Sequence, residues 1–215
     1  ATWQKLAPLT ILSFFLINLN NSLLWLVASR NVLLGGILGI NQSQLRSIIA
    51  YSSISHIGWI IRILYVNKPT LCLIYYIIYV FLITPIFILL NSTLTKNLKN
   101  LNSIMNLRPI IKISLVIMLL SLAGLPPFTG FIPKLVVLLV IFNNGAILGI
   151  ILIIGSLITL YFYLNVSIVL ILNLRYGSII IKNGKGLITF FTTRLLSLAI
   201  LPLILLYAMT IFNKS

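Results

Sequence analysis

The chain has 215 residues, of which 60% are apolar and only 7% are charged, and its mean hydropathy is +1.19. A soluble domain carries about a quarter charged residues, so this composition excludes an ordinary soluble fold. The apolar runs are near-continuous rather than alternating, which excludes a membrane β-barrel. The sequence therefore predicts helices that cross a membrane several times.

The charge is entirely of one sign. The chain has 15 lysines and arginines and no aspartate or glutamate, which gives a formal charge of +15. These basic residues lie between apolar runs rather than in one patch, so we expect no nucleic acid partner. A cation inside the membrane must then find its counter-charge on another chain or on lipid. With one histidine, one cysteine (Cys72) and no carboxylate, we expect neither a metal site nor a disulfide within the chain.

The apolar runs predict an all-α fold, a polytopic membrane helix bundle of about seven transmembrane helices, one of them broken. The predicted spans are about 3–19, 22–39, 45–66, 70–92, 113–142 (the broken one), 146–172 and 188–211. Short polar connections join them, so we expect one membrane domain over residues 1–215. In the sixth span Gly155, Thr159 and Tyr163 share a helix face, which indicates close packing or, alternatively, part of an ion path.

The basic residues also predict an orientation. The second, fourth and sixth connections hold Arg46, Lys96, Lys99, Arg108, Lys112, Arg175, Lys182 and Lys185. The other connections hold only Lys68, with Arg62 near a helix end. The positive-inside rule then places the chain's first residues inside and its last outside. Arg30 falls in the middle of the second span, where snorkelling, a lipid phosphate or an acid of another chain would each accommodate it.

The broken span carries the clearest functional signal. Between Ser121 and Lys134 the apolar run is interrupted by Gly124, Pro126, Pro127, Gly130 and Pro133. Such breaks at bilayer depth occur where backbone lines a polar cavity or packs in protein, and they often mark an ion path. A lysine beside the break is costly as a buried charge and is suited to exchanging a proton. The alternative is a lysine that snorkels to the interface.

Two further residues are candidates for proton transfer. Lys5 lies close to Pro8 in the first span, either as a functional group or as an ordinary flanking anchor. His56 shares a helix face with Ser52, and Ser53 is adjacent. A neutral imidazole accepts at one nitrogen and donates at the other, as a relay requires. A lone histidine is, alternatively, a hydrogen-bonded packing residue.

Five segments resemble a known family. They are Thr2-Trp-Gln-Lys-Leu-Ala-Pro8, Asn41-Gln-Ser-Gln-Leu-Arg46, Ala50-Tyr-Ser-Ser-Ile-Ser-His-Ile-Gly-Trp59, Leu122-Ala-Gly-Leu-Pro-Pro-Phe-Thr-Gly-Phe-Ile-Pro-Lys134 and Ile158-Thr-Leu-Tyr-Phe-Tyr-Leu164. In their order and spacing they resemble subunit 2 of mitochondrial NADH–ubiquinone oxidoreductase (respiratory complex I), an antiporter-like membrane subunit. The resemblance covers essentially all 215 residues.

This resemblance implies a fold of two inverted five-helix repeats. The span at about 3–19 matches the last helix of the first repeat, about 22–172 the second repeat, and about 188–211 a C-terminal helix. We expect the N-terminal first repeat, with its intramembrane glutamate near Lys5, to be missing from this chain. Lys5 and Lys134 match the lysines of the central hydrophilic axis, and His56 matches the histidine between them.

The resemblance also implies a function. It predicts a core membrane-arm subunit that contributes a lysine/histidine proton path, coupled to electron transfer from NADH to ubiquinone in other subunits. FMN, iron–sulfur clusters and ubiquinone would belong to those subunits, with no cofactor and no redox site in this chain. The expected partners are other complex I membrane subunits and a phospholipid such as cardiolipin, in the mitochondrial inner membrane, with the glutamate supplied by a separate chain or by a missing segment. The alternatives are a structural subunit that no longer pumps and a cation/proton antiporter subunit.

Overall fold

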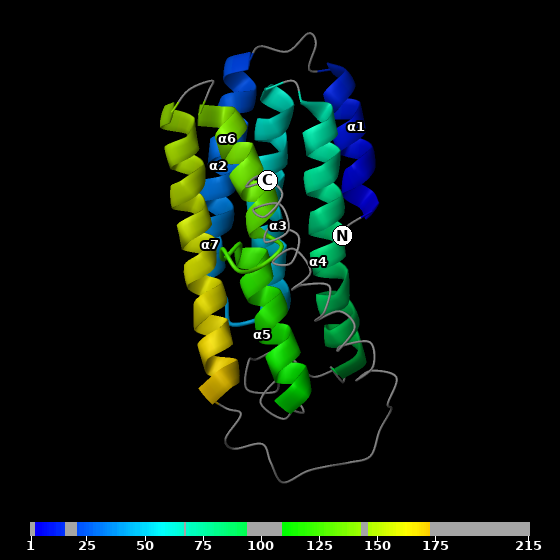
Figure 1. The fold of residues 1–215 in the computed structure, drawn as a ribbon, viewed down its shortest axis with the longest axis vertical. Coiled ribbons are helices and arrows are strands. Elements are labelled where there is room, and N and C mark those ends of the chain that lie inside the picture. Colours follow the sequence, from blue (N-terminus) through cyan, green and yellow to red (C-terminus); the bar gives the residue numbers. More distant parts are fainter. Residues whose placement is uncertain (1–2, 16–20, 67, 94–108, 143–145, 173–215) are drawn as a thin grey trace, which may run out of the picture.

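The described part of the chain is an upright bundle of helices (Figure 1). The computed structural model describes residues 3–15, 21–66, 68–93, 109–142 and 146–172. Its elements are the 3₁₀ turn η1 (Trp3–Lys5) and the helices α1 (Leu6–Phe15), α2 (Asn21–Ile40), α3 (Leu45–Tyr65), α4 (Pro69–Thr93), α5 (Pro109–Ala123), α6 (Phe131–Phe142) and α7 (Ala146–Leu172). Within these residues every element is helical, which confirms the all-α class.

The helices match the predicted spans closely. Three stretches are long and apolar enough to cross a membrane by length and composition: Leu45–Tyr65, Pro69–Ile88 and Gly149–Leu172. The predicted broken span appears as α5 and α6, with 15 and 12 residues. At 1.5 Å per residue they are about 22 and 18 Å long, so each is too short to cross the hydrocarbon core alone. The predicted span at 188–211 and the end of the predicted span at 3–19 lie outside the described residues.

Helix α2 packs closely against α3 and α7, because small residues let the backbones approach. A Cβ atom on Gly155 of α7 would clash with the side chain of Val32 in α2. A Cβ atom on Gly58 of α3 would lie 2.8 Å from the carbonyl oxygen of Ala28, also in α2. The close packing predicted at Gly155 is therefore confirmed, and it follows the use of small residues at membrane helix contacts.

Two buried clusters fill the bundle on either side of the helix break. The first joins α3, α4, α5 and α7 and includes Ile49, Ile83, Leu119 and Phe162. The second joins α2, α3, α4, α6 and α7 and includes Val32, Trp59, Tyr76, Val137 and Leu152. The break between α5 and α6 thus lies at the boundary between the two clusters, with α5 in the first and α6 in the second.

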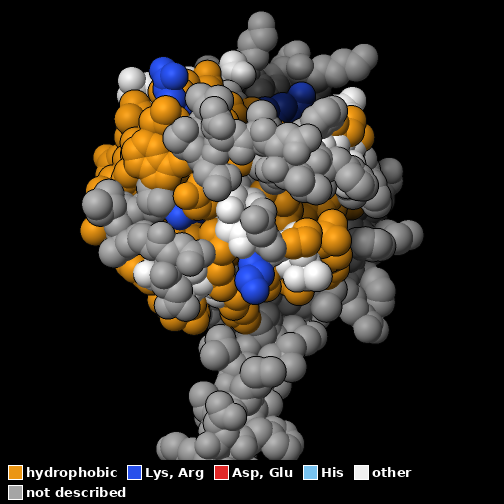
Figure 2. All heavy atoms as spheres, turned by 90° about the horizontal axis from the view of Figure 1, so that it is seen from above, with side chains coloured by type: hydrophobic (Ala, Val, Ile, Leu, Met, Phe, Trp, Pro, Cys, Tyr) orange, Lys and Arg blue, Asp and Glu red, His pale blue; other side chains and the backbone are white. Residues whose placement is uncertain are grey.

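The outer surface is apolar. Large hydrophobic side chains stand outward from several helices, among them Ile77, Leu139 and Leu172, each more than 60% exposed. Seen from above, the described side chains are mostly hydrophobic, with a few separate lysine and arginine side chains (Figure 2). Such an extended exposed apolar surface fits contact with lipid or neighbouring membrane helices.

Candidate functional site

The candidate site begins at the end of α5, where Gly124 stops the helix inside the bundle. Gly124 has a φ of +84°, a conformation that side chains with a Cβ atom rarely adopt. Its N–H group donates to the carbonyl oxygens of Leu120 and Ser121 at 3.3 and 3.0 Å. This is the glycine ending common to helices, and it leaves the last carbonyls of α5 free to accept other donors.

The chain then folds back tightly before α6. Pro126 and Pro127 are exposed at the turn, and neither has an N–H group that would need a partner. The hydroxyl groups of Ser121 and Thr129 are hydrogen-bonded at 2.8 Å and fasten the turn to α5. Gly130 packs directly on the Ser121 carbonyl, which leaves no room for a Cβ atom there. The sequence therefore predicted the helix break at the right place.

Lys134 lies in the first turn of α6, one residue after the buried Pro133, and points back at the end of α5. Its side chain is only 6% exposed. The amino group donates to the carbonyl oxygen of Ala123 at 2.7 Å and to that of Leu122 at 3.4 Å. We call these two oxygens the carbonyl pair. The C-terminal end of a helix carries partial negative charge, so the carbonyl pair compensates the lysine charge without a carboxylate. The side chain is turned inward rather than snorkelling outward.

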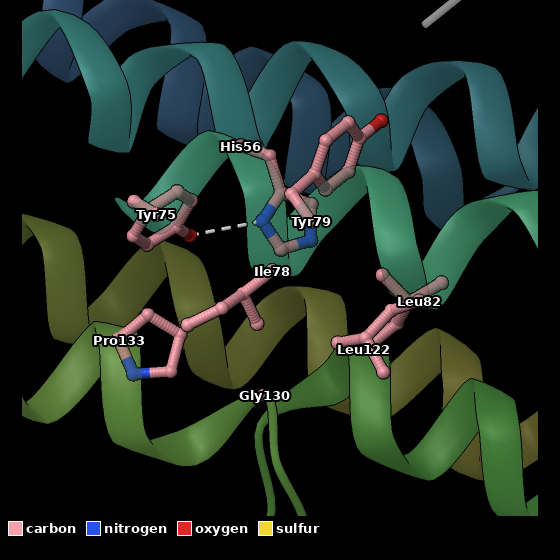
Figure 3. Close-up of a pocket in the computed structure, with 8 residues that line it drawn as sticks. All are labelled: His56, Tyr75, Ile78, Tyr79, Leu82, Leu122, Gly130 and Pro133. Carbon is pink, nitrogen blue, oxygen red and sulfur yellow. Dashed lines mark hydrogen bonds between the residues drawn. The ribbon is translucent and has the colours of Figure 1, made fainter. Parts of the chain in front are cut away.

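His56 is buried in the middle of α3, where it faces two tyrosines of α4 (Figure 3). Its Nδ1 atom is 2.9 Å from the Tyr75 hydroxyl oxygen, and either group donates depending on the tautomer. The ring of Tyr79 lies 4.8 Å from the imidazole, measured between ring centroids. The two tyrosines therefore hold the ring of His56 from both sides.

Lys5 approaches the same place from the start of the described chain. It is half-buried at the end of η1, with its amino group 5.8 Å from the centroid of the Tyr79 ring. The Tyr79 ring thus contacts both Lys5 and His56. Lys134 follows Pro133, which lines the same recess as His56 and Tyr79. The three predicted residues therefore lie in one region of the bundle, with the Tyr79 ring next to both Lys5 and His56.

A small recess separates His56 from the helix break. It is lined by His56, Tyr75, Ile78, Tyr79, Leu82, Leu122, Gly130 and Pro133 (Figure 3). Most of these side chains are apolar, and the recess has room for about one water molecule. Among the described residues no hydrogen bond joins His56 to Lys134. A proton moving between them needs water to enter or side chains to move.

Ser52 and Ser53 do not contribute hydrogen bonds to His56. The Ser52 hydroxyl donates to the carbonyl of Ile49 at 2.8 Å, and the Ser53 hydroxyl donates to that of Ala50 at 2.6 Å. Serines inside helices often bond back to their own backbone in this way. The shared helix face was predicted correctly, but these hydroxyls are bonded within α3.

The aromatic residues of the site were not predicted from the sequence. Tyr75 and Tyr79 are four residues apart in α4, and this helical spacing is the signal that would have pointed to them. Trp59 of α3 places its ring 6.0 Å from the Lys134 amino group. Within the described part of the chain, the indole nitrogen of Trp59 and the hydroxyl of Tyr163 are buried without hydrogen-bond partners. Buried polar groups of this kind are commonly satisfied by water.

Comparison with known sequences places the chain in a family. The profile of the transmembrane family described as NADH:quinone oxidoreductase/Mrp antiporter matches residues 1–159. The chain belongs to this family. It is also 44% identical over 168 residues to NADH-ubiquinone oxidoreductase chain 2 of Lumbricus terrestris, covering 78% of this chain. The chain spans about half the length of that relative, since the match covers 50% of it.

Solved structures share the fold of this antiporter-family chain. A chain of respiratory complex I from Thermus thermophilus with bound aureothin matches with a TM-score of 0.68 and 22% identity, covering 84% of this chain and 43% of that chain. A chain of the archaeal membrane-bound sulfane sulfur reductase matches with a TM-score of 0.75 and 20% identity, covering 90% and 40%. The broken helix and its neighbours therefore form a fold found in more than one membrane complex.

Proposed function

We propose that this chain is a membrane-arm subunit of mitochondrial complex I that carries part of a proton path. In this proposal, NADH oxidation and ubiquinone reduction take place in other subunits, which hold the FMN and the iron–sulfur clusters. The observation that carries the proposal is the buried Lys134 amino group held against the carbonyl pair at the helix break, next to the recess that His56 lines. The similarity to NADH-ubiquinone oxidoreductase chain 2 supports the choice of complex.

The proposed transfer uses Lys134 as a storage group and His56 as a relay. The carbonyl pair stabilises the protonated lysine, and one water in the recess would connect it to His56. The hydrogen bond between Nδ1 of His56 and the Tyr75 hydroxyl would orient the imidazole ring and leave its other nitrogen to exchange a proton. Like charges repel strongly in a low dielectric, so a proton arriving at Lys5 would favour release from Lys134.

The same proposal assigns partners, orientation and repeats. A glutamate near Lys5 would come from another chain or from a segment outside this sequence, since the sequence has no acidic residue. The other complex I membrane subunits and a phospholipid such as cardiolipin complete the surroundings in the mitochondrial inner membrane. The first residues would face the matrix, η1 with α1 would end a first repeat, and α2 to α7 would form the second.

A second candidate is a structural subunit that joins its neighbours but does not pump. The narrow, mostly apolar recess near His56 favours it, because the described residues offer no continuous hydrogen-bonded route from His56 to Lys134. The two functions differ in one measurable property, which is whether proton transfer by the complex depends on Lys134.

The test is Lys134→Met in the assembled complex, reconstituted in sealed vesicles. We expect fewer protons to be moved per NADH oxidised, whereas NADH oxidation in open membranes partly survives. The matched control is Lys68→Met, which removes an exposed lysine between α3 and α4 and should leave pumping unchanged. Full pumping by the Lys134 variant would establish the structural alternative.

A further inference from the structure

Arg62 is another buried cation, in a chain that has no aspartate or glutamate to pair with it. It lies in the last turn of α3 and is only 1% exposed. Its guanidinium group stacks 4.2 Å from the centroid of the Tyr65 ring. All three of its side-chain nitrogens, Nε, Nη1 and Nη2, are buried without a hydrogen-bond partner among the described residues.

Burial of this kind is unfavourable unless something supplies acceptors. A guanidinium has five N–H donors and cannot be deprotonated in proteins, so it remains charged wherever it is placed. Stacking on an aromatic ring compensates only part of the lost hydration. The sequence contains no aspartate or glutamate, so no carboxylate side chain of this chain exists to pair with Arg62. A carboxylate side chain that pairs with Arg62 would therefore have to come from another chain or from a segment outside this sequence.

Arg62 lines a recess between three helices at one end of the bundle. The recess is narrow, with room for about one water molecule, and its other lining residues are Trp25, Ala28 and Ser29 of α2 with Ile151 and Leu152 of α7. Helix α3 ends at this end of the bundle, and α2 and α7 begin there (Figure 1). Every lining residue is therefore within about two turns of a helix end, which is where membrane head groups meet hydrocarbon.

The surroundings of the recess suit a lipid. The residues that flank it along the chain include Leu26 of α2 and Ile150 and Ile154 of α7, each about half exposed. These apolar side chains offer a surface for acyl chains next to a buried positive charge. Trp25 supplies the amphipathic ring that is typical of the membrane interface. A guanidinium binds two oxygens of a phosphate group through its planar fork.

We propose that Arg62 binds the phosphate group of a membrane phospholipid after the side chains that line the recess move apart to admit it, and that the acyl chains lie along the exposed faces of α2 and α7. The Arg62 fork donates to the phosphate oxygens, and Ser29 lies at the same recess. This site is separate from Lys134 and His56, and it does not depend on the function proposed above.

The test measures phospholipid binding to the complete complex. The complex is purified in mild detergent, depleted of bound phospholipid and titrated with phosphatidylglycerol, with bound lipid counted by native mass spectrometry. For Arg62→Met we expect one phospholipid fewer per complex, or an affinity at that site lower by about tenfold or more. Arg62→Lys keeps the charge without the fork, so it should retain part of the affinity.

The control is Arg46→Met, which removes the same charge from an exposed position at the opposite end of α3 and should leave the lipid count unchanged. Methionine fills a similar volume without a charge, so the Arg62 variant is expected to fold, as an unchanged thermal unfolding midpoint would show. Equal lipid counts in all variants would overturn the proposal. Binding of inorganic phosphate alone at this site would also overturn it, as would a map showing a partner's carboxylate against Arg62.

Discussion

Lys134 and Arg62 are two buried cations in a chain without acids, and the fold treats them differently. Lys134 donates two hydrogen bonds to the carbonyl pair at the end of α5. Arg62 stacks on one ring and makes no hydrogen bond among the described residues. The first charge is compensated by backbone that belongs to the same chain. The charge of Arg62 depends on acceptors that the described residues do not supply.

The difference comes from where the neighbouring helices end. Helix α5 ends inside the bundle because Gly124 reverses the chain there, so its last carbonyls point at the interior. Helix α3 ends at the surface of the bundle, one turn beyond Arg62. A helix end makes a useful negative pole for a buried lysine only when it is itself buried. The carbonyl pair at the end of α5 therefore compensates the charge of Lys134, as a carboxylate otherwise would.

The largest expected effect comes from disturbing the turn that shapes the carbonyl pair. Gly130→Ala would drive a Cβ atom into the Ser121 carbonyl, which is backbone and has little freedom to move. We expect a loss of about 2–3 kcal/mol in the free energy of unfolding, together with reduced pumping. Thermal unfolding of the assembled complex measures the first effect.

Gly149→Ala is the matched control for this substitution. Its Cβ atom would lie 3.0 Å from the ring of Phe142, a side chain that is itself exposed and free to shift. The control should therefore cost less stability than Gly130→Ala. Equal losses in the two variants would mean that the turn is no more constrained than an ordinary helix contact.

A somewhat smaller effect is expected for Gly124→Ala, which acts on the carbonyl pair more directly. The positive φ costs a residue with a Cβ atom about 1–2 kcal/mol. The added Cβ would also lie 3.0 Å from the Lys134 amino nitrogen, so the amino group must shift. We expect lower stability and weaker pumping than in Leu125→Ala, a half-buried neighbour in the same turn. Wild-type pumping would show that contact with the carbonyl pair is dispensable.

A moderate effect is expected at the relay. Tyr75→Phe removes the hydrogen bond to His56 and leaves the aromatic ring in place. The expected cost is about 1 kcal/mol in the free energy of unfolding, with fewer protons moved per NADH oxidised. Tyr161→Phe, at an exposed position of α7, should change neither quantity. A Tyr75 variant that pumps like the wild type would show that this hydrogen bond does not orient the relay.

The smallest effect on pumping is expected at Arg62. Arg62→Met should leave the number of protons per NADH unchanged, because Arg62 lies outside the recess at His56. In lipid-depleted detergent the variant should be as stable as the wild type or more stable by about 1 kcal/mol, since an unpaired buried charge is removed. Added phospholipid should then stabilise the wild type more than the variant. A pumping defect in Arg62→Met would show that the recess at Arg62 and the recess at His56 are functionally coupled.

Much of this fold was predictable because its signals are local. Apolar run lengths predicted the helices, and the spacing of Pro and Gly predicted the break before Lys134. Which group faces Lys134 was not predictable, because it depends on how the turn folds back onto α5. The contact between His56 and Tyr75 joins residues 19 positions apart on two different helices, and the spacing within each helix does not tell which faces meet. Arg62 looked like an ordinary helix-end residue, since its burial arises only when α2 and α7 pack over it.

The carbonyl pair also relates proton occupancy to side-chain position. A protonated Lys134 has three N–H donors and a full charge, so it is held firmly against the end of α5. A neutral amine has only two donors and a lone pair that repels carbonyl oxygens, so the same contact loses much of its strength. Gaining or losing one proton would then fasten or release a flexible four-carbon side chain beside the recess. The position of the Lys134 side chain at the helix break would therefore depend on whether its amino group is protonated.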